Sequence, residues 1–102
     1  MMGPPAPSER NELRHGFIAY GKAKPDLFRI SGEELAEEMD RLAEKAERFD
    51  LTLHMWGFPY GVDDDLVVVY ESEKGLENYM NYEIGTELPY TNTRTTIVAI
   101  PS

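Results

Sequence analysis

The residues best suited to do chemistry gather in one stretch, residues 54–66, which reads HMWGFPYGVDDDL. His54 and Trp56 stand two positions apart, so on an extended chain their side chains point to the same side. A histidine titrates near neutral pH and could act as a general acid or base, orient a ligand or bind a metal. Three consecutive aspartates, residues 63–65, could supply the oxygen ligands that calcium or magnesium requires.

The aspartates are better explained by a turn than by a metal site. Three consecutive residues cannot all point at one ion, and no EF-hand spacing or distant glutamate completes a set of ligands. Aspartate side chains bond nearby backbone N–H groups, and charge at a strand end discourages edge pairing. We therefore predict that residues 57–65 form a long hairpin connection, with its glycines and proline serving backbone geometry.

His54 remains the one candidate catalytic residue, although a structural histidine bonded to a neighbour is the commoner case. The aromatic residues could line a pocket for a flat ligand, or they could be core and dimer contacts. His15 is the only other histidine, and there are no cysteines, so zinc–thiolate sites, thiol nucleophiles and disulfides are excluded. We expect no metal and no cofactor. The candidate ligand-binding residues are Tyr20, Trp56, Phe58, Tyr70, Arg94 and His15.

Length and charge restrict the class of protein. A chain of 102 residues is one domain, and we expect a Pro-rich flexible tail at residues 1–13 and a single domain at residues 14–102. The net charge of −9 argues against nucleic acid as a partner. No apolar run approaches the roughly 20 residues that cross a bilayer, so no membrane association is expected. The missing disulfides are consistent with the cytoplasm.

Hydrophobic periodicity predicts the elements that must position these residues. Ser31 and Glu34 form an S-x-x-E capping box that starts a helix, whose apolar stripe runs to Phe49 at spacings of four and three. A second helix is expected after Ser72, with Leu76, Tyr79, Met80 and Ile84 on one face and Gly85 as its stop. Strands are predicted at residues 15–21, 51–56, 66–70 and 93–100.

The resulting order, β-α-β-β-α-β, is that of a ferredoxin-like α+β fold with a four-stranded antiparallel sheet. Both helices should cover one face of the sheet, and the opposite face should be polar if it meets water. The strands at residues 51–56 and 66–70 instead carry apolar or aromatic residues on both sides. We therefore expect the second face to meet the sheet of an identical subunit.

The stretch DLVVVYESEKGLENYM, followed by LPYTNTRTTIVAI, resembles the second half of the dimeric α/β-barrel superfamily. It is most similar to stand-alone GYD-type proteins and to the ligand-binding domain of Lrp/AsnC-type regulators. Gly61 and Asp65 or Asp64 take the hairpin positions of those families, and the last strand begins with Arg94. The resemblance implies a homodimer whose two sheets enclose a cavity, which in the superfamily serves as an effector site, as a substrate pocket of a cofactor-free enzyme or as a haem site.

The leading hypothesis is a homodimeric protein that holds a small apolar or aromatic molecule beside each sheet, oriented by His54, Tyr20, Tyr70 and Arg94. The first alternative is a cofactor-free enzyme of the monooxygenase, isomerase or cyclase type, with His54 as general acid or base. The second is a structural assembly module whose barrel is filled by side chains.

Overall fold

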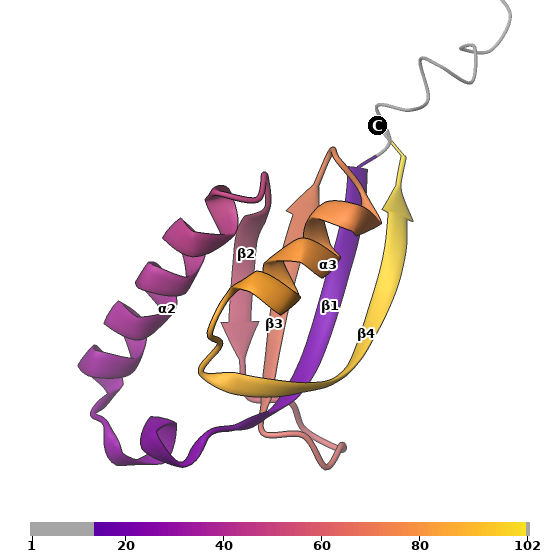
Figure 1. Cartoon of the computed structure of the whole chain (residues 1–102). Coiled ribbons are helices and arrows are strands. Elements are labelled where there is room, and N and C mark those ends of the chain that lie inside the picture. Colours follow the sequence, from indigo (N-terminus) through magenta and orange to yellow (C-terminus); the bar gives the residue numbers. More distant parts are fainter. Residues whose placement is uncertain (1–13, 102) are drawn as a thin grey trace, which may run out of the picture.

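The computed structural model describes residues 14–101, so the segment expected as a flexible tail, residues 1–13, lies outside the described residues. The elements are β1 (Arg14–Ala23), the short 3-10 helix η1 (Pro25–Arg29), α2 (Gly32–Glu47), β2 (Thr52–Gly57), β3 (Leu66–Ser72), α3 (Leu76–Gly85) and β4 (Tyr90–Ile100). The four strands form one antiparallel sheet in the order β2-β3-β1-β4. The predicted ferredoxin-like α+β fold is confirmed, with α2 and α3 on the same side of the sheet (Figure 1).

The first helix follows its sequence pattern. The Ser31 side chain accepts a hydrogen bond from the Glu34 backbone N–H, and the Glu34 carboxylate accepts one from the Ser31 N–H, both at 3.2 Å. This reciprocal bonding satisfies two donors that the first turn of a helix leaves without partners. Met39, Leu42 and Ala46 are buried against the sheet, as the apolar stripe predicts.

Helix α3 does not bury the apolar residues that its sequence pattern predicts. It buries Tyr79 and Tyr82, whereas Leu76, Met80 and Ile84 remain 48%, 48% and 80% exposed. The expectation that these three apolar residues would share the core-facing side with Tyr79 is therefore wrong. The physical reason is that residues three apart share a helix face, and two tyrosine rings fill the space above the sheet.

We call the helix-covered side of the sheet the covered face. Phe17 and Ala19 of β1 and Leu66, Val68 and Tyr70 of β3 are buried there. The Tyr70 hydroxyl lies between two others, 2.7 Å from that of Tyr82 and 2.8 Å from that of Tyr90. Each buried hydroxyl thus has a partner, which removes the cost of desolvating it.

The predicted alternation holds along β3 but fails along β2. A bulge between Leu53 and Met55 places the extra residue, His54, out of register. Leu53 then pairs with Tyr70 and Trp56 with Val68, both on the covered face, whereas Met55 pairs with Val69 on the opposite face. His54 and Trp56 therefore do not share a face, because one inserted residue reverses the side on which every later side chain points.

No helix among residues 14–101 has the length and apolar character needed to span a membrane.

Candidate functional site

The side of the sheet away from the helices, here called the free face, is largely apolar. Its residues follow from the strand register: Arg14, Gly16, Ile18 and Tyr20 of β1; Thr52 and Met55 of β2; Val67, Val69 and Glu71 of β3; Arg94, Thr96 and Val98 of β4. Ile18 and Val69 pair at its centre. Helices α2 and α3 lie on the other side of the sheet (Figure 1). The charged side chains stand at the two ends of this strip, whereas Thr96 pairs with Ile18 at its centre.

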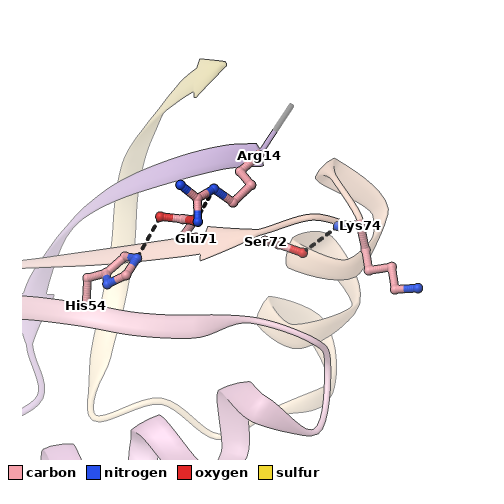
Figure 2. A network of polar contacts seen from close by, with 5 residues as sticks. All are labelled: Arg14, His54, Glu71, Ser72 and Lys74. Atoms are coloured by element: carbon pink, nitrogen blue, oxygen red, sulfur yellow. Dashed lines mark hydrogen bonds and ion pairs between the residues drawn. The ribbon is translucent and has the colours of Figure 1, made fainter. Parts of the chain in front are cut away.

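At one end, Glu71 links two basic side chains, as Figure 2 shows. Its Oε1 lies 2.7 Å from His54 Nε2, and its Oε2 lies 2.8 Å from Arg14 Nε. The Glu71 side chain is largely buried, whereas those of Arg14 and His54 are about half exposed. When His54 Nε2–H donates to the carboxylate, Nδ1 is left as an acceptor, so Glu71 fixes both the tautomer and the ring orientation.

At the other end, Tyr20 and Arg94 pair across β1 and β4. The guanidinium carbon of Arg94 lies 4.4 Å from the centre of the Tyr20 ring, which is a cation–π contact. Within residues 14–101, no carboxylate stands within ion-pair distance of Arg94. The stacked guanidinium keeps its N–H edge available to a ligand.

Four of the candidate residues, Tyr70, Trp56, Phe58 and His15, lie elsewhere. Tyr70 is fully buried on the covered face, where burial raises the pKa of its hydroxyl far above the usual range. Trp56 packs against the same core and meets the exposed Phe58 edge to face, with ring centres 6.0 Å apart. His15 pairs with Ala99 on the covered side, and its Nδ1 is buried without a hydrogen-bond partner. The free face thus brings together Tyr20 and Arg94 at one end, with His54 at the other.

Two aspartates of the hairpin bond to other strands and not to the backbone of their own turn. Asp65 Oδ2 accepts a hydrogen bond from the Ala23 N–H at 3.1 Å, and Asp64 Oδ1 accepts one from the Thr93 hydroxyl at 2.6 Å. The two carboxylates tie the hairpin to β1 and β4. In the part of the chain that the structure describes, no group of three or more His, Asp or Glu residues is arranged to hold a metal ion.

Glu71 and Arg14 also belong to the site, although neither was predicted from the sequence. Glu71 follows Val67 and Val69 at spacings of two on β3, so the alternation already placed it on the free face. Arg14 has the same parity as Ile18 and Tyr20, but it precedes the expected start of its strand. No sequence pattern indicated the bond between Glu71 and His54, because that bond depends on the bulge at His54.

The free face is an open surface in a single chain. A cleft of about 470 Å³ opens beside the Glu71 end of the sheet rather than over the apolar strip. Its lining residues are Arg14, Glu47, Asp50, Leu51, Thr52, Glu71, Ser72, Glu73 and Lys74. Enclosing a ligand over Ile18 and Val69 requires a second surface.

Comparisons with known proteins give a fold and no family. No family model matches the chain, and no curated protein matches it. Among solved structures, chlorite dismutase from Candidatus Nitrospira defluvii in complex with imidazole superposes with a TM-score of 0.59 at 16% identity, covering 95% of this chain and 45% of that one. A mutant of the same enzyme in complex with cyanide gives 0.57 at 16% identity, covering 93% and 44%. A double mutant gives 0.58 at 14% identity, covering 87% and 40%.

This chain therefore spans less than half the length of the chlorite dismutase chains that it resembles. At such low identity the likeness concerns the fold alone. The chain adopts the ferredoxin-like α+β fold that is found in chlorite dismutase.

Proposed function

We propose that two copies of this chain place their free faces together and hold a small, mostly apolar or aromatic molecule between them. The observation that carries this proposal is the apolar free face, on which Ile18, Val67 and Val69 are partly exposed on the side of the sheet opposite α2 and α3. An apolar patch of this kind marks an interaction surface in a protein that is otherwise strongly charged. A two-fold pair of such faces buries both copies of the patch.

Two further observations support the proposal. The chlorite dismutase chains are more than twice the length of the part they share with this chain, so a second copy would supply a comparable amount of structure. Two of those structures hold small molecules, imidazole and cyanide. The resemblance to GYD-type proteins and to Lrp/AsnC ligand-binding domains points to the same sheet-to-sheet dimer.

The polar groups at the two ends would orient the ligand. Tyr20 offers an aromatic face, and Arg94 offers the donors of a guanidinium held by that ring. His54 offers Nδ1 from a ring that Glu71 holds in place. A few directed polar groups around an apolar surface are the usual composition of a small-molecule site.

Val69→Asp tests this function. It puts a charge at the centre of the free face, so light scattering should show half the mass of the unaltered assembly. Native mass spectrometry should show a retained small molecule on the unaltered dimer and none on the variant. Val62→Asp is the matched control, because Val62 is exposed on the hairpin away from this strip. A dilute unaltered chain that scatters as a monomer overturns the proposal.

A cofactor-free enzyme is the second candidate, and the Glu71–His54 contact at 2.7 Å favours it. A carboxylate that holds one imidazole nitrogen leaves the other free to move a proton, as in general acid–base catalysis. Proton exchange at acidic C–H groups, followed by NMR in D2O over a panel of enolisable ketones, tests the activity. His54→Gln should abolish the exchange while ligand retention on the dimer persists; exchange that survives excludes this role.

A further inference from the structure

A row of apolar side chains runs along the outer side of α3. Leu76, Met80 and Ile84 are spaced by four residues, and they point away from the sheet that Tyr79 and Tyr82 contact. Residues at this spacing form a continuous ridge along one side of a helix. We call these three residues the α3 ridge.

One apolar residue of the sheet is also exposed on the side that α3 covers. Ile97 of β4 pairs with Phe17 of β1, and the Phe17 ring stacks on that of Tyr79 with centres 4.4 Å apart. Ile97 is itself about half exposed, beside the α3 side of the sheet. Large apolar side chains that are contiguous at a surface indicate a contact with another molecule.

We propose that a second copy of this chain covers the α3 ridge by packing its own α3 against it, antiparallel and about a two-fold axis. Two ridges of i±4 spacing interdigitate, which is the commonest way in which helices pack. Met80 then lies at the axis against Met80 of the second copy, and Leu76 lies against Ile84 of the second copy. A ridge with apolar residues at both ends and in the middle is complementary to itself under this symmetry.

Charge favours a second copy at this surface. The chain carries a net charge of −9, and the outer side of α2 exposes Glu33, Glu37, Glu44 and Glu47, so two copies repel each other there. Glu77 is the acidic residue that flanks the α3 ridge. In the antiparallel arrangement it approaches the far end of the second α3. A cleft of about 360 Å³ lies there, lined by Lys45, Arg48, Phe49, Gly85, Thr86 and Glu87. The carboxylate of Glu77 in one copy then approaches the positive charges of Lys45 and Arg48 in the other.

This contact is separate from the one proposed for the free face. Helix α3 lies on the covered side of the sheet, opposite Ile18 and Val69 (Figure 1). Both contacts can therefore form at once, and two sheet-to-sheet dimers joined through α3 make a four-copy assembly. Formation of the α3 contact does not depend on ligand binding at the free face.

Cross-linking tests the geometry, because the chain has no cysteines of its own. Met80→Cys should form a disulfide-linked dimer rapidly under mild oxidation, since residues at the axis approach within disulfide range. Ile84→Cys alone should cross-link poorly, but a mixture of separately prepared Leu76→Cys and Ile84→Cys chains should cross-link well. Phe28→Cys is the matched control, because Phe28 is an exposed apolar residue on η1. Cross-linking of Met80→Cys no faster than this control overturns the proposal.

A measurement of mass in solution tests the energetics. Met80→Glu should halve the mass seen by sedimentation equilibrium, while Phe28→Glu leaves it unchanged. Glu77→Arg should weaken the assembly at least tenfold, and a second change, Arg48→Glu, should restore it. If Val69→Asp lowers the mass but Met80→Glu does not, the free-face dimer survives and the α3 contact is excluded. If Met80→Glu halves the mass but no ligand is retained, the α3 contact survives without the proposed function.

Discussion

The two faces of the sheet differ in what covers their apolar residues. On the covered face every strand contributes to a closed core, and the hydroxyls of Tyr70, Tyr82 and Tyr90 satisfy one another. On the free face the apolar residues are only partly buried, and two polar groups stand apart at its ends: Glu71 with Arg14 and His54, and Arg94 with Tyr20. The covered face is complete within one chain, whereas the free face leaves apolar surface and directed polar groups for something else to use.

The difference predicts where substitutions cost most. Phe17→Ala removes a fully buried ring that stacks on Tyr79, so it should lower the free energy of unfolding by about 3–5 kcal/mol. Ile18→Ala, one residue along β1 but on the free face where Ile18 is only partly buried, should cost less, roughly 1–2 kcal/mol, in dilute, monomeric protein. Urea denaturation of both variants measures the contrast. Equal losses would show that the two faces are not distinct.

Alkaline pH should destabilise the covered face. Burial raises the pKa of Tyr79 from 10.0 to about 12, and burial likewise raises the pKa values of Tyr70, Tyr82 and Tyr90. The unfolded chain loses these protons first, so the free energy of unfolding falls as pH rises above 10, by about 1.4 kcal/mol per pH unit for each tyrosine. For Tyr79 the loss ends near pH 12. Urea denaturation between pH 9 and 11.5 measures it, and a flat profile there would contradict the burial of this cluster.

Glu83 gives a smaller effect in the acidic range. Burial raises its pKa above the usual 4.5, its Oε1 accepts a bond from Asn92 at 2.7 Å, and its Oε2 is buried without a partner. The folded state holds the proton more tightly, so stability falls as pH rises from 4.5 toward the raised pKa. Glu83→Gln should remove this fall and gain on the order of 1 kcal/mol at pH 7. Glu87→Gln, at an exposed position, is the control and should leave the profile unchanged.

The sequence predicted the elements whose signals are local. The capping box at Ser31 and the stripe that includes Met39 and Leu42 specified α2, and the alternation along β3 specified which side Tyr70 and Val69 take. These signals suffice because a helix face or a strand face repeats every few residues. The order of the elements then left few topologies to consider.

The predictions from sequence were wrong where a single residue determines the side on which its neighbours lie. The bulge at His54 puts Trp56 on the covered face, and nothing in the composition of β2 distinguishes a regular strand from a bulged one. In α3 the apolar spacing of Leu76, Met80 and Ile84 was as strong as a core signal, yet Tyr82 takes the inner position. Periodicity shows that a face is apolar, but not which molecule covers it.

The smallest expected effect is the coupling energy between Arg14 and Glu71 at one end of the free face. Its size indicates how far water reaches this end of the face. A double-mutant cycle between Arg14→Gln and Glu71→Gln should give a coupling of about 0.2–1 kcal/mol in dilute protein, because water screens the half-exposed Arg14. The coupling should fall when salt is raised from 50 mM to 500 mM. If a second copy covers the free face at high protein concentration, excluding that water should increase the coupling and reduce its salt dependence. Urea denaturation at two protein concentrations measures both quantities. A coupling energy that does not change with protein concentration would mean that this end of the sheet remains exposed to water. The molecule that covers Ile18 and Val69 would then not extend to Glu71.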